Sequence, residues 1–165
     1  MSQIFRGLLL LAAAAFCFNA HAEAAIKFND LPFDLALKIV KGGGQRKLAY
    51  FTDPQCNYCK KLEEELTDID NVTLYVFLYP VFPGSEGMVR DVMCASDPAK
   101  TWDDLMLRDR RPPPRYCATQ AGETLHLGKR LHVEGTPTLI FQDGSMVSGY
   151  LPSASLELML FASGQ

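Results

Sequence analysis

The sequence of 165 residues lacks an excess of positive charge, a long apolar run and a dense set of cysteines. Its 16 Lys and Arg stand against 19 Asp and Glu, which excludes the basic field that sequence-independent nucleic-acid binding requires. Five cysteines are too few for a scaffold held mainly by disulfides. At roughly 100 to 200 residues per domain, the length predicts a single domain. We therefore expect an ordinary globular protein without a nucleic-acid partner.

The first 22 residues have the pattern of a secretory signal peptide. Arg6 is followed by the apolar run 7–18 and by Asn19-Ala20-His21-Ala22, which ends in a small-x-small cleavage pattern. The run is shorter than the ~20 residues that a membrane-spanning helix requires. We therefore expect export, with no membrane span after the signal is removed. The remaining residues 23–165 keep an even number of cysteines, which in an exported protein is typical of disulfide chemistry: Cys56, Cys59, Cys94 and Cys117.

The centre of the chain predicts a β-α-β unit. Leu48–Thr52 is apolar and β-favouring and ends at Asp53-Pro54, while Val72–Tyr79 is nearly all apolar or β-branched. Between them lies a helix whose apolar stripe follows three- and four-residue steps: Cys59, Leu62, Leu66 and Ile69. The pattern assigns the charged residues to its other face: Lys60, Lys61, Glu63, Glu64 and Glu65. A helix between two such strands predicts that the strands are parallel.

The rest of the chain predicts helices and one hairpin. Segment 30–41 has Leu31, Leu35 and Ile39 at intervals of four, which favours a short amphipathic helix. Further helices are expected over 88–95, 98–107, 119–133 and from Pro152 onward, and a hairpin over 138–149. The proline-rich segment 108–115 reads as a solvated loop. Some side chains are assigned to packing and others to the surface: Trp102, Leu156, Met159 and Leu160 to packing, His126 and His132 to the surface.

The chemistry concentrates at Cys56-Asn57-Tyr58-Cys59, which lies between the first strand and its helix. At a helix start, Cys56 faces unpaired backbone N–H groups and the positive end of the helix dipole, which favour its thiolate. Cys59 lies within one turn, close enough to attack a mixed disulfide formed on Cys56. The pattern therefore predicts a redox-active dithiol.

Two other interpretations of this pair remain open. A structural zinc site would need two more ligands, and Cys94 and Cys117 are separated by 22 residues, so they form no second tight pair. His126 and His132 lie about 240° apart around a helix and do not complete the set. A purely structural disulfide within the pair would close a short, strained loop and gain little entropy. We expect no metal and no organic cofactor.

A local redox pair leaves Cys94 to pair with Cys117. That disulfide would close the helical insertion and its proline loop, and would stabilise the fold by roughly 3 kcal/mol in the chain-entropy model. We interpret it as structural, because neither cysteine has a neighbouring thiol to resolve an intermediate.

Three segments together resemble the catalytic domain of the periplasmic disulfide isomerases DsbC and DsbG: residues 51–62, 71–80 and 135–144. The resemblance runs from about Lys47 to Leu160. It implies an α/β thioredoxin fold with a helical insertion, with Cys56 as nucleophile and Cys59 as resolving thiol. It also implies that Pro137 is cis and faces the pair, and that Thr136 offers backbone hydrogen bonds to an extended substrate. From the residues alone, Thr136-Pro137 reads as an ordinary strand-edge or turn proline.

Two departures from that family bear on function. Family members usually carry Gly-Tyr between the cysteines, whereas Asn57-Tyr58 stands here and is expected to change the redox potential. The family's isomerases also have an N-terminal dimerisation domain. Here we expect a short extension over 23–46, with the amphipathic helix as a remnant of the linker, before a catalytic domain over 47–165, and therefore a monomer.

These observations predict a periplasmic thiol:disulfide oxidoreductase that isomerises or reduces wrong disulfides in exported proteins. The resemblance implies a membrane electron donor of the DsbD type. A monomeric oxidase or dedicated reductase is the competing enzyme function. A chaperone-like binding module with a vestigial redox pair is the competing function outside enzymes.

Overall fold

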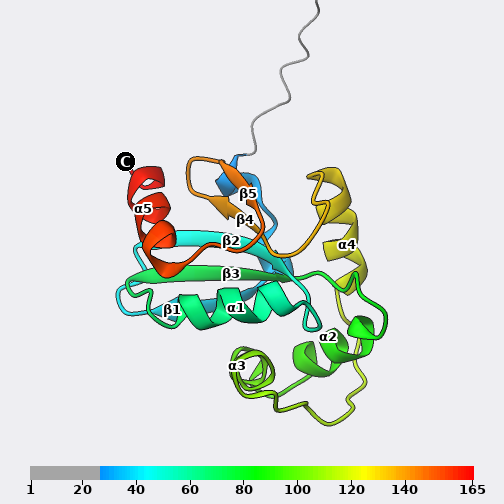
Figure 1. Ribbon diagram of the computed structural model, residues 1–165. Helices are drawn as coiled ribbons and strands as arrows, with labels where there is room; N and C mark the ends of the chain where they lie inside the picture. The colour runs from blue at the N-terminus through cyan, green and yellow to red at the C-terminus, as the bar shows by residue number, and fades with distance from the viewer. Residues whose placement is uncertain (1–26) are drawn as a thin grey trace, which may run out of the picture.

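A computed structural model describes residues 27–165, so the proposed signal peptide lies outside the described residues. A five-stranded mixed sheet runs through the centre of this part, in the order β1-β3-β2-β4-β5 (Figure 1). The elements have the following bounds: η1 Phe28–Asp30, η2 Phe33–Leu35, β1 Leu37–Lys41, β2 Arg46–Thr52, α1 Asn57–Leu66, β3 Val72–Leu78, α2 Ser85–Met93, α3 Pro98–Arg108, α4 Ala121–Arg130, β4 Thr138–Phe141, β5 Met146–Ser148 and α5 Ser153–Ser163.

The predicted β-α-β unit is confirmed. Strands β2 and β3 pair in parallel, from Arg46 opposite Val72 to Thr52 opposite Leu78, and α1 connects them. Strand β4 runs antiparallel to β2, with Thr138 opposite Phe51. This register places the start of β4 beside the end of β2, where α1 begins.

The alternation of side chains along the strands builds a core on each face of the sheet. On one face, Leu48 and Tyr50 of β2 pack with residues of α1, α2, α3 and α5. On the other face, Ala49 and Phe51 pack with residues of η1 and α4. More layers of helix cover the α1 face, because α3 packs on α1 and α2 packs on α3 (Figure 1).

The helix predicted over 30–41 is wrong. Two short 3-10 turns stand there, followed by β1, which pairs antiparallel with β3. Leucine and isoleucine spaced by four residues fit a period of two as well as a period of 3.6, and exposure alternates along Leu37–Lys41. The open edge of β3 favours the strand, because pairing there satisfies backbone groups that a helix would leave unpaired.

The remaining helices and the hairpin are confirmed, with small shifts at their ends. Trp102, Leu156 and Leu160 are fully buried as predicted, and both His126 and His132 are exposed. Within residues 27–165, no helix has the length and apolar character needed to cross a bilayer.

Candidate active site

Cys56 is the N-cap of α1. Its sulfur accepts a hydrogen bond from the backbone N–H of Cys59 at 3.2 Å, and its own N–H donates to the carbonyl oxygen of Asp53. The capping interaction places the sulfur at the positive end of the helix dipole, which favours negative charge there. The sequence-based placement of Cys56 at the helix start is therefore confirmed.

Cys59 lies one turn into α1 and is completely buried, whereas Cys56 keeps 4 % of its surface exposed. Both are free thiols. Burial raises the pKa of the Cys59 thiol to about 12, and the hydroxyls of Thr52 and Thr136 lower it against that trend. The pair is thus asymmetric: Cys56 at the end of α1 keeps a small exposed fraction, whereas the Cys59 thiol is completely buried and stays protonated at neutral pH.

The Thr136-Pro137 peptide bond is cis, and it precedes β4. The register of β4 on β2 brings this segment to the loop between β2 and α1, where the thiol of Cys56 donates to the carbonyl oxygen of Thr136 at 3.2 Å. Pro137 is buried, and its carbonyl oxygen accepts from the N–H of Gly149. The structure therefore brings Cys56, Cys59, Thr136 and Pro137 together.

Asp53 forms hydrogen bonds that join the loop between β2 and α1 to the loop after β3. Its side chain is fully buried and accepts four hydrogen bonds. The donors are the backbone N–H groups of Gln55, Val81 and Phe82 and the hydroxyl of Ser85, at 2.6 to 3.0 Å. In the sequence, Asp53-Pro54 marks only the end of the first strand, and nothing there signals these hydrogen bonds.

Exposed apolar side chains flank Cys56. Tyr58 is 60 % exposed on the first turn of α1, with the Lys61 ammonium group 5.5 Å from the centre of its ring. Val81 and Phe82, on the loop that Asp53 holds, are 46 % and 45 % exposed. These side chains provide an exposed apolar surface next to the loop that carries Cys56.

Glu63 was assigned to the charged face of α1, and that assignment is wrong. Its side chain is buried, and its Oε1 accepts from the Tyr50 hydroxyl at 2.9 Å and from Trp102 Nε1 at 2.8 Å. Burial raises the pKa of Glu63 to about 7. The signal was present in the sequence, because residues 59, 62, 63 and 66 form one continuous stripe of a helix.

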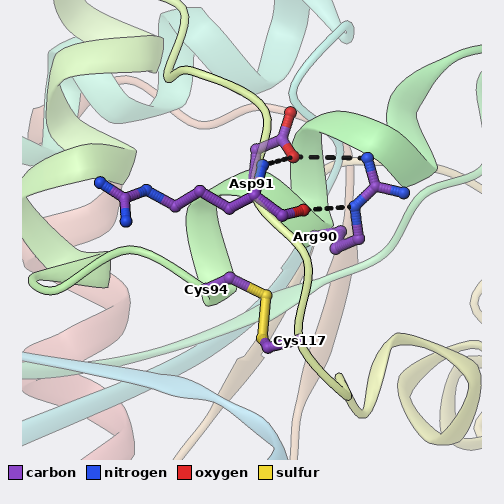
Figure 2. Close-up of a disulfide and its surroundings, with 5 residues drawn as sticks. Arg90, Asp91, Cys94 and Cys117 are labelled. Carbon is purple, nitrogen blue, oxygen red and sulfur yellow. Dashed lines mark hydrogen bonds and ion pairs between the residues drawn. A yellow bond between two sulfur atoms is a disulfide. The ribbon is translucent and has the colours of Figure 1, made fainter.

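Cys94 and Cys117 form a disulfide, with their Cα atoms 5.8 Å apart, which is the pairing expected from the sequence. Figure 2 shows how α2 also holds the loop next to this bridge. The backbone N–H of Arg115 donates to Asp91 Oδ1, and Arg90 Nε donates to the Arg115 carbonyl oxygen, each at 2.9 Å. Among the described residues, no group of three or more His, Cys, Asp or Glu side chains is arranged to hold a metal ion.

Comparison with known proteins places this geometry in a family. Residues 33–163 match the thioredoxin-like domain, so the fold class predicted from the sequence is confirmed. A probable thiol:disulfide interchange protein DsbC from Bordetella pertussis is 50 % identical over 138 residues, 83 % of this chain and 50 % of that protein. The thiol:disulfide interchange protein DsbC of Escherichia coli is 31 % identical over 119 residues, 68 % of this chain and 50 % of that protein. The chain thus spans about half the length of these curated relatives.

This chain also matches a solved structure over nearly all of that structure's own length. The disulfide interchange protein from Neisseria gonorrhoeae superposes with a TM-score of 0.79 at 36 % identity, covering 82 % of this chain and 99 % of that one.

Proposed function

Because the chain belongs to the thioredoxin-like domain family, and within it to the thiol:disulfide interchange proteins, we propose that it exchanges disulfides with client proteins through Cys56 and Cys59. The asymmetry of the two thiols carries this proposal. Cys56 caps α1 and keeps 4 % of its surface exposed, which suits the nucleophile, whereas Cys59 is completely buried, which suits a thiol that acts second.

In the first step the Cys56 thiolate attacks one sulfur of a client disulfide. A bond forms between Cys56 and that sulfur, and the other client sulfur leaves as a thiolate. A client thiolate can then displace Cys56 and form a new client disulfide, which is isomerisation. Alternatively, Cys59 displaces the client, which leaves the client reduced and joins Cys56 to Cys59.

Client recognition follows from what surrounds Cys56. An extended client segment would pair with the backbone at Thr136 beside Pro137, and its apolar side chains would pack on Tyr58, Val81 and Phe82. Asn57 and Tyr58 lie between the two cysteines on the first turn of α1, where they adjust the stability of the Cys56 thiolate.

The proposal also covers the location, the electron donor and the oligomeric state of the protein. We propose a periplasmic protein that acts on exported clients and is kept reduced by a membrane donor of the DsbD type, with the Cys94–Cys117 bridge as a structural disulfide and the described chain as a monomer. An exported location agrees with a permanent disulfide, which is rare in the cytosol.

The test is refolding of a client with scrambled disulfides by residues 23–165, with Cys56→Ala and Cys59→Ala as variants and light scattering for mass. Isomerase activity that Cys56→Ala abolishes supports the proposal. Full retention of activity in Cys56→Ala would favour a binding module instead. Formation of disulfides in a reduced client, without rearrangement of scrambled ones, would favour an oxidase.

A further inference from the structure

The function proposed above makes no use of the arginine-rich loop between α3 and α4. Segment 108–115 holds four arginines and three consecutive prolines within eight residues. All four arginines are exposed, in a protein whose net charge is -3. A strongly positive patch on an otherwise acidic protein attracts anions to that patch. The loop is therefore a candidate for binding a negatively charged ligand.

Three of these arginines line one cavity. Arg110, Arg111 and Arg115 lie around a hollow of about 230 Å³, which we call the arginine cavity. Ser96, in the turn after α2, lies in the same wall, and its hydroxyl can donate a hydrogen bond. At about 30 Å³ for each water molecule, the arginine cavity is large enough for a small oxyanion together with some of its water.

The arginine cavity has more positive than negative charge. Asp104 is the one carboxylate among its lining residues in the described part of the chain. Lys100 and Arg108 donate to this carboxylate, and Arg110 Nη1 lies 3.7 Å from its Oδ1. Across residues 27–165, neither Arg111 nor Arg115 forms an ion pair with a carboxylate. Three arginines against one aspartate leave two positive charges in excess at the cavity.

The loop that carries these arginines is held in place before any ligand binds. The backbone N–H of Arg115 donates to Asp91 Oδ1, and its carbonyl oxygen accepts from Arg90 Nε, each at 2.9 Å (Figure 2). The Cys94–Cys117 disulfide ties the same loop to the end of α2. The three prolines also have a fixed φ angle. A site that is already ordered loses little conformational freedom on binding, which favours affinity.

The arginine cavity lies away from the dithiol. Gln55 Nε2, in the loop that carries Cys56, donates to the hydroxyl of Ser85, the first residue of α2, at 3.2 Å. Ser96 follows the other end of this nine-residue helix, which is about 14 Å long at 1.5 Å per residue. A ligand in the arginine cavity therefore occupies a site separate from Cys56.

The chemistry of the arginine cavity favours a phosphate group. The planar guanidinium group of arginine forms paired hydrogen bonds with phosphate oxygens. A phosphate monoester carries a charge of about -1.5 to -2 at pH 7, which matches the excess positive charge, whereas a single carboxylate carries only one negative charge.

We propose that Arg110, Arg111 and Arg115 bind a phosphate group in the arginine cavity, either free phosphate or the phosphate of a lipid headgroup. The proposal is independent of the function proposed above, because the site is separate from the dithiol. The loop and its disulfide then have a binding role in addition to their place in the fold.

The test measures binding of two probes to residues 23–165. Isothermal titration in a buffer without phosphate reports binding of sodium phosphate. Co-sedimentation with phosphatidylcholine vesicles, with and without phosphatidic acid, reports binding of a lipid phosphate. We expect Arg111→Gln and Arg115→Gln each to weaken binding on the order of tenfold, because each removes charge-assisted hydrogen bonds. Arg115→Gln keeps the backbone hydrogen bonds that hold the loop.

Lys129→Gln and Arg130→Gln are the matched controls, because they remove the same charge from exposed positions on α4. Both should bind the probes as the wild type does. Each arginine variant should also unfold at the same urea concentration as the wild type, which shows that a loss of binding is not a loss of folding.

A variant without the disulfide distinguishes an ordered cavity from diffuse positive charge. Replacing Cys94 and Cys117 by Ala keeps every arginine but frees the loop, so binding should weaken severalfold. Unchanged binding in this double variant would overturn an ordered site.

The two probes also identify the source of the phosphate. Binding of sodium phosphate supports a site for free phosphate, and binding that requires phosphatidic acid supports a site for a lipid headgroup. Absence of binding to both probes would overturn the proposal. An equal loss in the α4 control variants would also overturn it, and so would tighter binding of hexaglutamate than of either phosphate probe, which would indicate an acidic peptide instead.

Discussion

The thiol of Cys56 donates to the carbonyl oxygen of Thr136 at 3.2 Å, across 80 residues of sequence. A thiolate has no proton to donate, so ionisation of Cys56 breaks this bond and leaves the Thr136 carbonyl free to accept from a client backbone. Under the proposed function, ionisation of Cys56 and exposure of the Thr136 carbonyl to a client are therefore the same event.

The first prediction concerns a trap for clients. Cys59→Ser keeps the nucleophile but removes the sulfur that releases the client, so mixed disulfides on Cys56 should accumulate. Non-reducing electrophoresis after reaction with a disulfide-containing client should show a covalent adduct that a reductant removes. Cys56→Ser should give none, because Cys59 is fully buried and protonated at neutral pH. Equal adducts from both variants would contradict the assignment of the two roles.

The second prediction concerns the hydrogen bonds that Asp53 accepts. Each carboxylate oxygen accepts two hydrogen bonds, so in Asp53→Asn the amide NH₂ leaves at least one backbone N–H without an acceptor. Leaving a buried donor unsatisfied costs about 1–3 kcal/mol. Urea unfolding at pH 7 should show this loss. Asp68→Asn, an exposed position, should stay within about 0.5 kcal/mol of the wild type.

Much of this site was predictable because local chemistry and tertiary structure agree there. Asp53-Pro54 ends a strand, Cys56 begins a helix, and the next apolar run can only return to the sheet. The strand at Leu37–Lys41 was missed because the pairing that selects it lies on β3, some 35 residues further along the chain. The sequence of this segment fits a strand period of two and a helical period of 3.6 equally well, and pairing with β3 selects the strand.

Glu63 and the cis peptide bond before Pro137 show two other limits of prediction from the sequence. Glu63 lies on the stripe of residues 59, 62, 63 and 66, but its four charged neighbours make it read as solvent-facing. The fold alone shows that Tyr50 and Trp102, on separate elements, satisfy it. The cis isomer has no signal in the local residues, and the family resemblance alone predicted it.

The third prediction concerns the Cys94–Cys117 bridge, which joins positions 23 apart. Replacing both cysteines by Ala should lower the free energy of unfolding by roughly 3 kcal/mol in the chain-entropy model, because the unfolded chain regains the freedom of that loop. The rate at which Cys56 of the reduced protein reacts with 5,5′-dithiobis(2-nitrobenzoate) should stay unchanged. Adding dithiothreitol should destabilise the wild type and leave the double variant as it is; an equal effect on both would contradict a structural role.

The fourth prediction follows from the titration of Glu63. The pKa of its carboxyl group lies near 7 in the folded protein, against an ordinary value of 4.5 when unfolded. Between these values the folded state binds the proton more tightly, so the stability from this group is complete below about pH 4.5 and is lost as the pH rises through 7. At 1.36 kcal/mol per pKa unit, the loss reaches up to ~3 kcal/mol.

Glu63→Gln removes this dependence while its amide oxygen keeps the acceptor for Tyr50 and Trp102. Urea unfolding should therefore show a wild type that loses stability between pH 5 and pH 8, and a Glu63→Gln variant that loses less and is the more stable of the two at pH 8. Glu64→Gln should follow the wild type at both pH values. A Glu63→Gln variant that is less stable than the wild type at pH 8 would contradict a buried carboxyl group that ionises near neutrality.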